Sequence, residues 1–149
     1  MGEQATERIV VGAPPEQVFA VASDLEHYPD WTGDVKDVVI ESRDSEGRPA
    51  VVTFRAAAFG RSTSYTLAYD YSDAPHTLAW RQTRGDLTNK LDGTYTFDAA
   101  GDGGTKVTYV LEVDLKVPLP GFVKRRTQSR IMHIALEELR DRVESTPAT

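Results

Sequence analysis

The sequence contains no cysteine. Without thiols, a chain of 149 residues cannot be a disulfide scaffold, an iron–sulfur protein, a thiolate zinc site or an enzyme with a cysteine nucleophile. It also has no apolar run near the roughly 20 residues that a membrane-spanning helix needs. The N-terminal residues lack the apolar core of a signal peptide. We therefore expect a cytoplasmic protein.

Positive charge is in the minority, with 17 lysines and arginines against 23 aspartates and glutamates, for a formal net charge of −6. Nucleic-acid binding depends on neutralising phosphates, so this balance argues against a nucleic-acid partner. The sequence contains no P-loop, GxGxxG, GxSxG or HExxH pattern, so it lacks the motifs typical of nucleotide-binding, hydrolase and zinc sites. We expect no cofactor and no metal, and we expect His133 and Glu137, one helical turn apart, to form a surface pair.

The chain is long enough for one domain with a substantial core and too short for two. Its 40% hydrophobic and 27% charged residues are typical of a globular protein. We therefore assign residues 1–149 to a single domain, and we expect residues 145–149 to be a frayed tail.

One strand and two short helices are predicted at the start of this domain. The strand covers Thr6–Val11. Pro14-Pro15-Glu16 opens the first helix, because proline suits the first helical turn. Leu25–Tyr28 forms the second helix, which Pro29 is expected to end.

An all-strand stretch and a long helix complete the chain. Short turns between six successive segments imply an antiparallel meander. The six strands are predicted at Val35–Glu41, Ala50–Phe59, Ser64–Tyr71, Thr77–Thr83, Leu87–Phe97 and Thr105–Val117. A helical pattern then runs from Phe122 to about Glu144.

Alternation along the strands assigns most side chains to one face of the sheet. In the last strand, Val107, Tyr109 and Leu111 alternate with polar residues, so they are expected inside. The same pattern places five of the six tyrosines and several other polar or aromatic residues on the inner face: Tyr65, Tyr69, Tyr71, Tyr95, Tyr109, Trp80, Gln82 and Asn89. The strand Ala50–Phe59 shows no alternation that assigns its face.

An inner face rich in hydroxyl and amide groups has two interpretations. Each buried hydroxyl without a partner costs about 1–3 kcal/mol. Such a face is therefore easier to satisfy if it lines a cavity that holds water or ligand. Alternatively, the tyrosines lie near strand ends and their hydroxyls reach the rim of the sheet.

The long helix has one apolar stripe. At about 100° per residue, this stripe holds Met132 and other aliphatic side chains, and the same side holds Gln128 and Arg125 nearer the N-terminus. We therefore expect Gln128 and Arg125 to face the sheet. Val123 and Ile134 are expected on the outward side, where they would meet a second copy in a homodimer; a monomer is the alternative.

The charges of this helix run against its dipole, with basic residues first and acidic residues late. The basic residues are Lys124, Arg125, Arg126 and Arg130. One interpretation is an anionic ligand group or membrane surface near the helix start. The other is pairing with acidic loop residues and with neighbours one turn away, for which Glu138–Arg142 and Arg140–Glu144 have the i,i+4 spacing.

Several stretches of the chain resemble a known family. They are Ile9–Phe19, Asp24–Trp31, Leu78-Ala79-Trp80, Gly93–Phe97, Gly104–Tyr109 and Leu119–Phe122. From Thr6 to Glu144 the chain is similar to the SRPBCC (START-like) superfamily, and within it to the polyketide cyclase/dehydrase and lipid transport group. The resemblance implies an α+β helix-grip fold. In it, a seven-stranded antiparallel sheet curls around the long C-terminal helix, two short helices follow the first strand, and a hydrophobic cavity lies between sheet and helix.

The resemblance also implies what the cavity does. Members of this superfamily bind or transform lipids, polyketides, isoprenoids and hormones, and a shared fold does not decide among these activities. The first expectation is a binding protein for a polyketide-, lipid- or isoprenoid-like molecule. The alternative is a polyketide cyclase, aromatase or dehydratase acting in the same cavity. A third is a lipid- or quinone-handling protein whose basic helix start contacts an anionic membrane.

Candidate site residues come from the inner face, the helix stripe and the corner after the short helices. The residues expected to contact the ligand are Trp31, Tyr65, Tyr69, Trp80, Gln82, Asn89, Tyr95, Tyr109, Arg125, Gln128 and Met132. Arg125 and Gln128 are also the candidates for catalysis. Trp31 is expected either as a lid that stacks on a ligand or as a plug beneath the short helices. No histidine or carboxylate stands out on the inward side. A tyrosine with an ordinary pKa of about 10 is a poor base at neutral pH, so these residues favour a binding protein over a cyclase or dehydratase.

Overall fold

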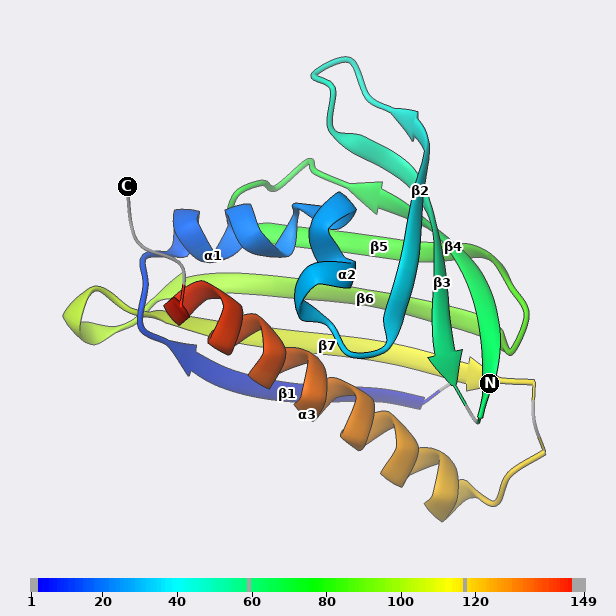
Figure 1. Cartoon of the computed structure of the whole chain (residues 1–149). Coiled ribbons are helices and arrows are strands. Elements are labelled where there is room, and N and C mark those ends of the chain that lie inside the picture. Colours follow the sequence, from blue (N-terminus) through cyan, green and yellow to red (C-terminus); the bar gives the residue numbers. More distant parts are fainter. Residues whose placement is uncertain (1–2, 59, 117, 146–149) are drawn as a thin grey trace.

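The computed structural model describes residues 3–58, 60–116 and 118–145. Seven strands form one antiparallel sheet in the order β1-β7-β6-β5-β4-β3-β2. The strands are β1 (Glu3–Val11), β2 (Val35–Arg43), β3 (Pro49–Ala58), β4 (Arg61–Asp70), β5 (Thr77–Gly85), β6 (Thr88–Ala99) and β7 (Thr105–Leu115). The long helix α3 (Gly121–Ser145) lies across one face of this sheet (Figure 1). The predicted seven-stranded sheet with a C-terminal helix is confirmed.

Two short helices and a 3₁₀ turn connect β1 to β2. Helix α1 (Pro15–Ala22) begins at a proline, whose missing N–H costs nothing in the first helical turn. The predicted boundaries of the second helix are wrong. A 3₁₀ turn, η1, covers Leu25–His27, and α2 covers Tyr28–Trp31. Pro29 lies in the first turn of α2, where it suits the opening of a helix and does not end one.

The predicted strands are all present and differ from the structure at their ends. β1 begins at Glu3, because its backbone pairs with β7 from that residue onward, with Glu3 opposite Val113. β4 begins at Arg61, ahead of the predicted start. The predicted strand ends at Phe59 and Val117, and tail residues 146–149, lie outside the described residues.

The core consists of two clusters on the inner face of the sheet. In the larger one, aliphatic side chains of α3 pack against β5, β6 and β7: Met132, Leu136, Leu139 and Val143 against Leu78, Phe97, Val107 and Leu111. In the smaller one, Val52 and Phe54 of β3 pack with Leu25 and Leu67. This packing assigns the face of β3 that the sequence left open, because Val52 and Phe54 are both buried on the inner side.

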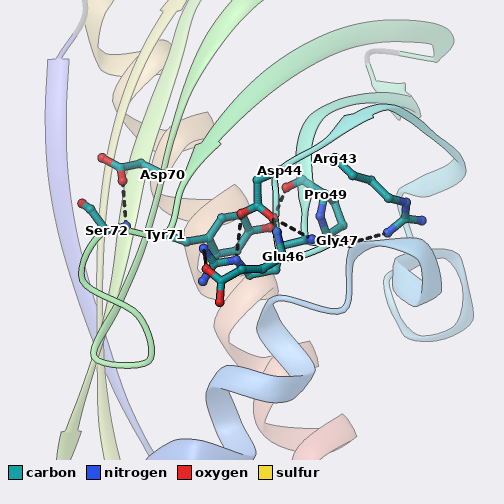
Figure 2. A network of polar contacts seen from close by, with 9 residues as sticks. Arg43, Asp44, Glu46, Gly47, Pro49, Asp70, Tyr71 and Ser72 are labelled. Carbon is teal, nitrogen blue, oxygen red and sulfur yellow. Dashed lines mark hydrogen bonds and ion pairs between the residues drawn. The ribbon is translucent and has the colours of Figure 1, made fainter.

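A polar network ties the turn between β2 and β3 to the end of β4 (Figure 2). Asp44 accepts hydrogen bonds from the backbone N–H groups of Glu46 and Arg48, and its carboxylate lies 2.8 Å from the Arg48 guanidinium. That guanidinium stacks 4.6 Å from the centroid of the Tyr71 ring. The Tyr71 hydroxyl donates to the Pro49 carbonyl at 2.7 Å. The polar end of this inner-face tyrosine is therefore satisfied by the protein itself.

Acidic side chains fasten the C-terminal half of α3 to the loops beside it. The Glu138 carboxylate accepts a hydrogen bond from the backbone N–H of Gly33 at 2.8 Å. The Glu144 carboxylate accepts one from Gly12, also at 2.8 Å. Among the described residues, the two glutamates thus contact loop N–H groups, and the i,i+4 spacing that the sequence offers them with arginines is not used for an ion pair.

Candidate ligand-binding site

A pocket of about 170 Å³ lies between the inner face of the sheet and α3. Its walls come from α2, the start of β2, strands β3 to β7 and the middle of α3. Eight lining residues are aromatic: Tyr28, Trp31, Phe54, Tyr65, Tyr69, Trp80, Tyr95 and Tyr109. Only Tyr28 and Phe54 are absent from the predicted contacts. The face of the Phe54 strand was unassigned, and Tyr28 was placed at the end of a helix.

Trp80 of β5 lies at the centre of the aromatic wall. Its ring centroid is 5.9 Å from that of Tyr69, 5.3 Å from that of Tyr95 and 5.9 Å from that of Tyr109. Gly93 on the neighbouring strand makes this position available, because a Cβ there would lie 2.6 Å from Trp80 Cζ2. A glycine in a strand thus allows a large ring to lie flat across the sheet.

Helix α2 supplies the opposite wall. The rings of Tyr28 and Trp31 meet edge to face, with centroids 4.9 Å apart. The Tyr28 hydroxyl donates to the Ala22 carbonyl, so Tyr28 presents its ring to the pocket and its polar end to the backbone. Trp31 is half-buried; it lines the pocket and also packs against the larger core cluster. Its position at the wall is compatible with both of its predicted roles.

The pocket tyrosines are neutral hydrogen-bonding groups. Burial raises the pKa of Tyr65 to about 12 and raises the pKa values of Tyr69, Tyr95 and Tyr109 well above the ordinary value. The described residues contain no buried side-chain nitrogen or oxygen without a hydrogen-bond partner. These hydroxyls can donate to a ligand carbonyl, but they cannot serve as bases near neutral pH.

Two carboxylates also line the pocket, exposed Asp34 directly before β2 and half-buried Glu138 on α3. The prediction that no carboxylate faces inward is therefore wrong. Ile131, Ile134 and Ala135 line the pocket with Glu138, at the spacing i, i+3, i+4, i+7 of one helix face. That spacing is the signal that could have identified Glu138. It also corrects the predicted outward position of Ile134.

Two predicted contacts on β5 and β6 lie outside the pocket walls. Asn89 is exposed, and its amide lies 3.5 Å from the Asp114 carboxylate. The pairing of β6 with β7 shifts between Thr88 and Lys90, and this bulge breaks the alternation that had placed Asn89 inside. The Gln82 amide donates to the Thr88 carbonyl at 2.8 Å, so it closes the end of the hairpin.

Three predicted contacts on α3 also lie outside the pocket walls. Arg125 is exposed, because the start of α3 extends past the edge of the sheet (Figure 1). Gln128 is buried, and its amide donates to the Leu111 carbonyl at 2.7 Å. Met132 is fully buried in the core. The inward side of the helix was predicted correctly for Gln128 and Met132, but both side chains stabilise the fold at this position.

The described part of the chain shows neither a metal centre nor a membrane-spanning helix. No group of three or more histidine, aspartate or glutamate side chains is arranged to hold a metal ion in the described ranges. The predicted pair of His133 and Glu137 is confirmed at 2.5 Å on the outer side of α3. No helix among the described residues is long and apolar enough to cross a membrane.

Comparison with known proteins identifies the class to which this fold and pocket belong. Residues 3–144 match the family model described as "Polyketide cyclase / dehydrase and lipid transport". The chain therefore belongs to this family, as the sequence motifs predicted. Curated protein sequences give no significant match.

Solved structures agree over nearly the whole chain. A START superfamily protein from Mycobacterium smegmatis has a TM-score of 0.90 at 25% identity, over 95% of this chain and 97% of that one. The Zhui aromatase/cyclase from Streptomyces sp. R1128 has a TM-score of 0.83 at 16% identity, over 97% and 94%. The di-domain aromatase/cyclase BexL has a TM-score of 0.75 at 18% identity, over 97% of this chain and 48% of that one. At such identities the two aromatase/cyclases are similar in fold alone.

Proposed function

We propose that this protein binds a small hydrophobic molecule, polyketide-, lipid- or isoprenoid-like, in the pocket between the sheet and α3. The observation that carries the proposal is the aromatic lining, with eight rings around one space. Ligand pockets typically combine apolar walls with a few placed polar groups, and here tyrosine hydroxyls and two carboxylates supply them. The contacts proposed for the ligand are Trp31, Tyr65, Tyr69, Trp80, Tyr95 and Tyr109.

The size of the pocket limits the ligand. At about 170 Å³ it is smaller than the roughly 300–1,000 Å³ of pockets that enclose drug-sized molecules. An apolar cavity of about 150 Å³ is enough for benzene. The pocket therefore suits a molecule of one or two rings, or one end of a longer chain. A location in the cytoplasm and a monomeric or homodimeric state remain predictions.

A cyclase or dehydratase activity is the second candidate, and the Glu138 carboxylate is the observation that favours it. A carboxylate beside a bound ligand can remove a proton, and neutral tyrosine hydroxyls can stabilise an enolate. In this proposal Glu138 takes the catalytic role that the sequence assigned to Arg125 and Gln128. The test is product analysis of a poly-β-ketone analogue with the protein and with Glu138→Gln. Faster or redirected ring closure that the variant loses would support an enzyme, whereas equal product mixtures would exclude it for that substrate.

A binding titration tests the main proposal. Both tryptophans of the chain line the pocket, so naphthalene should quench their fluorescence at one site per chain. Ala135→Phe fills the pocket from α3 and should abolish the quenching. Ala57→Phe adds the same ring at an exposed position and should leave binding unchanged. Equal binding by both variants would contradict a site in this pocket.

A further inference from the structure

The side chains that line the pocket carry charge of one sign. Asp34 and Glu138 are both acidic, and none of the described residues that line it is a lysine, arginine or histidine. Arg125, which the sequence placed inside, is exposed at the start of α3. The pocket thus lacks the cation that an anionic ligand would need.

The Glu138 carboxylate is held in place without being neutralised. One oxygen accepts a hydrogen bond from the Gly33 N–H at 2.8 Å. Within the described part of the chain, no lysine or arginine pairs with Glu138. The side chain is half-buried, where a charge is screened less by salt than on an open surface. A positive group entering the pocket would therefore meet an unpaired negative charge.

The aromatic wall favours the same sign of charge. The face of an aromatic ring carries partial negative charge, and cages of such rings recognise quaternary ammonium groups. Trp80, Tyr95 and Tyr109 pack against one another with ring centroids 4.5–5.9 Å apart, and all three line the pocket, so together they form one aromatic wall of it. Burial is the main cause of the raised pKa of Tyr95, and the Glu138 carboxylate adds to it, which agrees with a negative potential inside the pocket.

We propose that the ligand of this pocket carries a cationic end, an amine or quaternary ammonium group attached to an apolar body. The proposal rests on the proposed ligand-binding function and specifies its chemistry. The apolar body would lie against Phe54, Leu67 and Leu91, and the cation would lie against the wall of tyrosine and tryptophan rings, near Glu138. A carboxylate or phenolate ligand would be repelled by Glu138, and more weakly by the exposed Asp34.

Two isosteric probes separate charge from shape. Phenyltrimethylammonium and tert-butylbenzene have the same outline and differ by one positive charge. Titrated against tryptophan fluorescence, the cation should bind about tenfold more tightly than the neutral molecule. If the neutral probe binds equally well or better, the cationic end is excluded while the binding function stands. If neither probe binds, nor naphthalene, the binding function itself fails.

A matched pair of variants assigns the effect to the pocket. Glu138→Gln keeps an oxygen for the Gly33 N–H and removes the charge, so it should lower affinity for phenyltrimethylammonium about five- to tenfold and leave tert-butylbenzene unaffected. Glu137→Gln makes the same change in net charge at the neighbouring residue, which pairs with His133 outside the pocket walls. Equal loss in both variants would mean that the whole-protein charge, and not Glu138, attracts the cation, and would overturn the proposal.

Discussion

The two halves of α3 have the same helical geometry and opposite surroundings. The C-terminal half is fixed to the molecule by buried Leu136, Leu139 and Val143 and by the contacts of Glu138 and Glu144 with loop N–H groups. In the N-terminal half, Phe122 is 59% exposed, and the arginines around it are exposed as well. Helical periodicity continues through both halves, but the start of α3 extends past the edge of the sheet, and its buried contacts begin at Gln128 (Figure 1).

This difference separates two properties: which side of a helix faces inward, and how far along the helix the partner surface extends. The spacing of apolar residues says which side of a helix faces inward. It does not say how far the partner surface extends. Arg125 falls on the inward side of the helix and is nevertheless exposed, whereas Gln128, one turn later, is buried against β7. Stability and ligand contacts should therefore depend on α3 from Gln128 onward much more than on its first two turns.

The largest expected effect comes from the packed half. Leu136→Ala should lower the free energy of unfolding by about 2–5 kcal/mol, because it removes a buried side chain and leaves a cavity. Phe122→Ala in the exposed half should change it by less than about 0.5 kcal/mol. Urea denaturation followed by circular dichroism measures both. Similar losses in the two variants would mean that the start of α3 is packed as well.

A smaller effect is expected where the two halves meet. Gln128→Met keeps the side-chain volume but leaves the Leu111 carbonyl without its donor, so it should cost about 1–3 kcal/mol. Arg126→Met, half a turn earlier and exposed, is the control and should be nearly neutral. If Gln128→Met leaves the free energy of unfolding unchanged, a water molecule must donate to the Leu111 carbonyl in place of the Gln128 amide.

Alkaline titration measures the ionisation of the buried pocket tyrosines, which lie on the sheet beneath the C-terminal half of α3. Buried tyrosines keep their protons above the pKa of about 10 that they have in the unfolded chain. Above about pH 10 the folded state therefore binds more protons than the unfolded state. The contribution of these tyrosines to the free energy of unfolding is fully present below about pH 10 and is lost as pH rises through the folded pKa values. At about pH 11, ultraviolet absorbance should show little tyrosinate in the folded protein and much in urea. Equal ionisation in both states would mean that water fills the pocket freely.

The smallest effect concerns the basic start of α3. Arg126→Gln with Arg130→Gln removes positive charge from the second and third turns of α3, where the helix dipole acts weakly, so stability should rise by at most a few tenths of a kcal/mol. The predicted membrane contact has its own readout at this site. If it exists, sedimentation with phosphatidylserine vesicles at low salt should decrease in the double variant, by about 1 kcal/mol for each arginine. An unchanged low level of sedimentation in both proteins would remove that prediction.

Most of the fold could be predicted from the sequence, because alternation, turn residues and helical spacing are local properties. The order of elements, the inner tyrosines and the inward side of α3 all follow from such patterns. The errors occur where a distant segment decides the outcome. Asn89 is misplaced by a bulge in the pairing of β6 with β7, and Asp34 is a pocket residue only because the segment before β2 lies against α3.

The most direct test of the binding pocket is to observe where an apolar probe is bound. In a ¹⁵N-labelled sample, Trp31 and Trp80 give the only two indole N–H signals, and both residues line the pocket. Titration with naphthalene should shift both signals to saturation, together with backbone signals of Ala135 and Glu138, and should leave Phe122 and Arg126 unchanged. Saturable shifts confined to the exposed start of α3, or none at either tryptophan, would contradict the account.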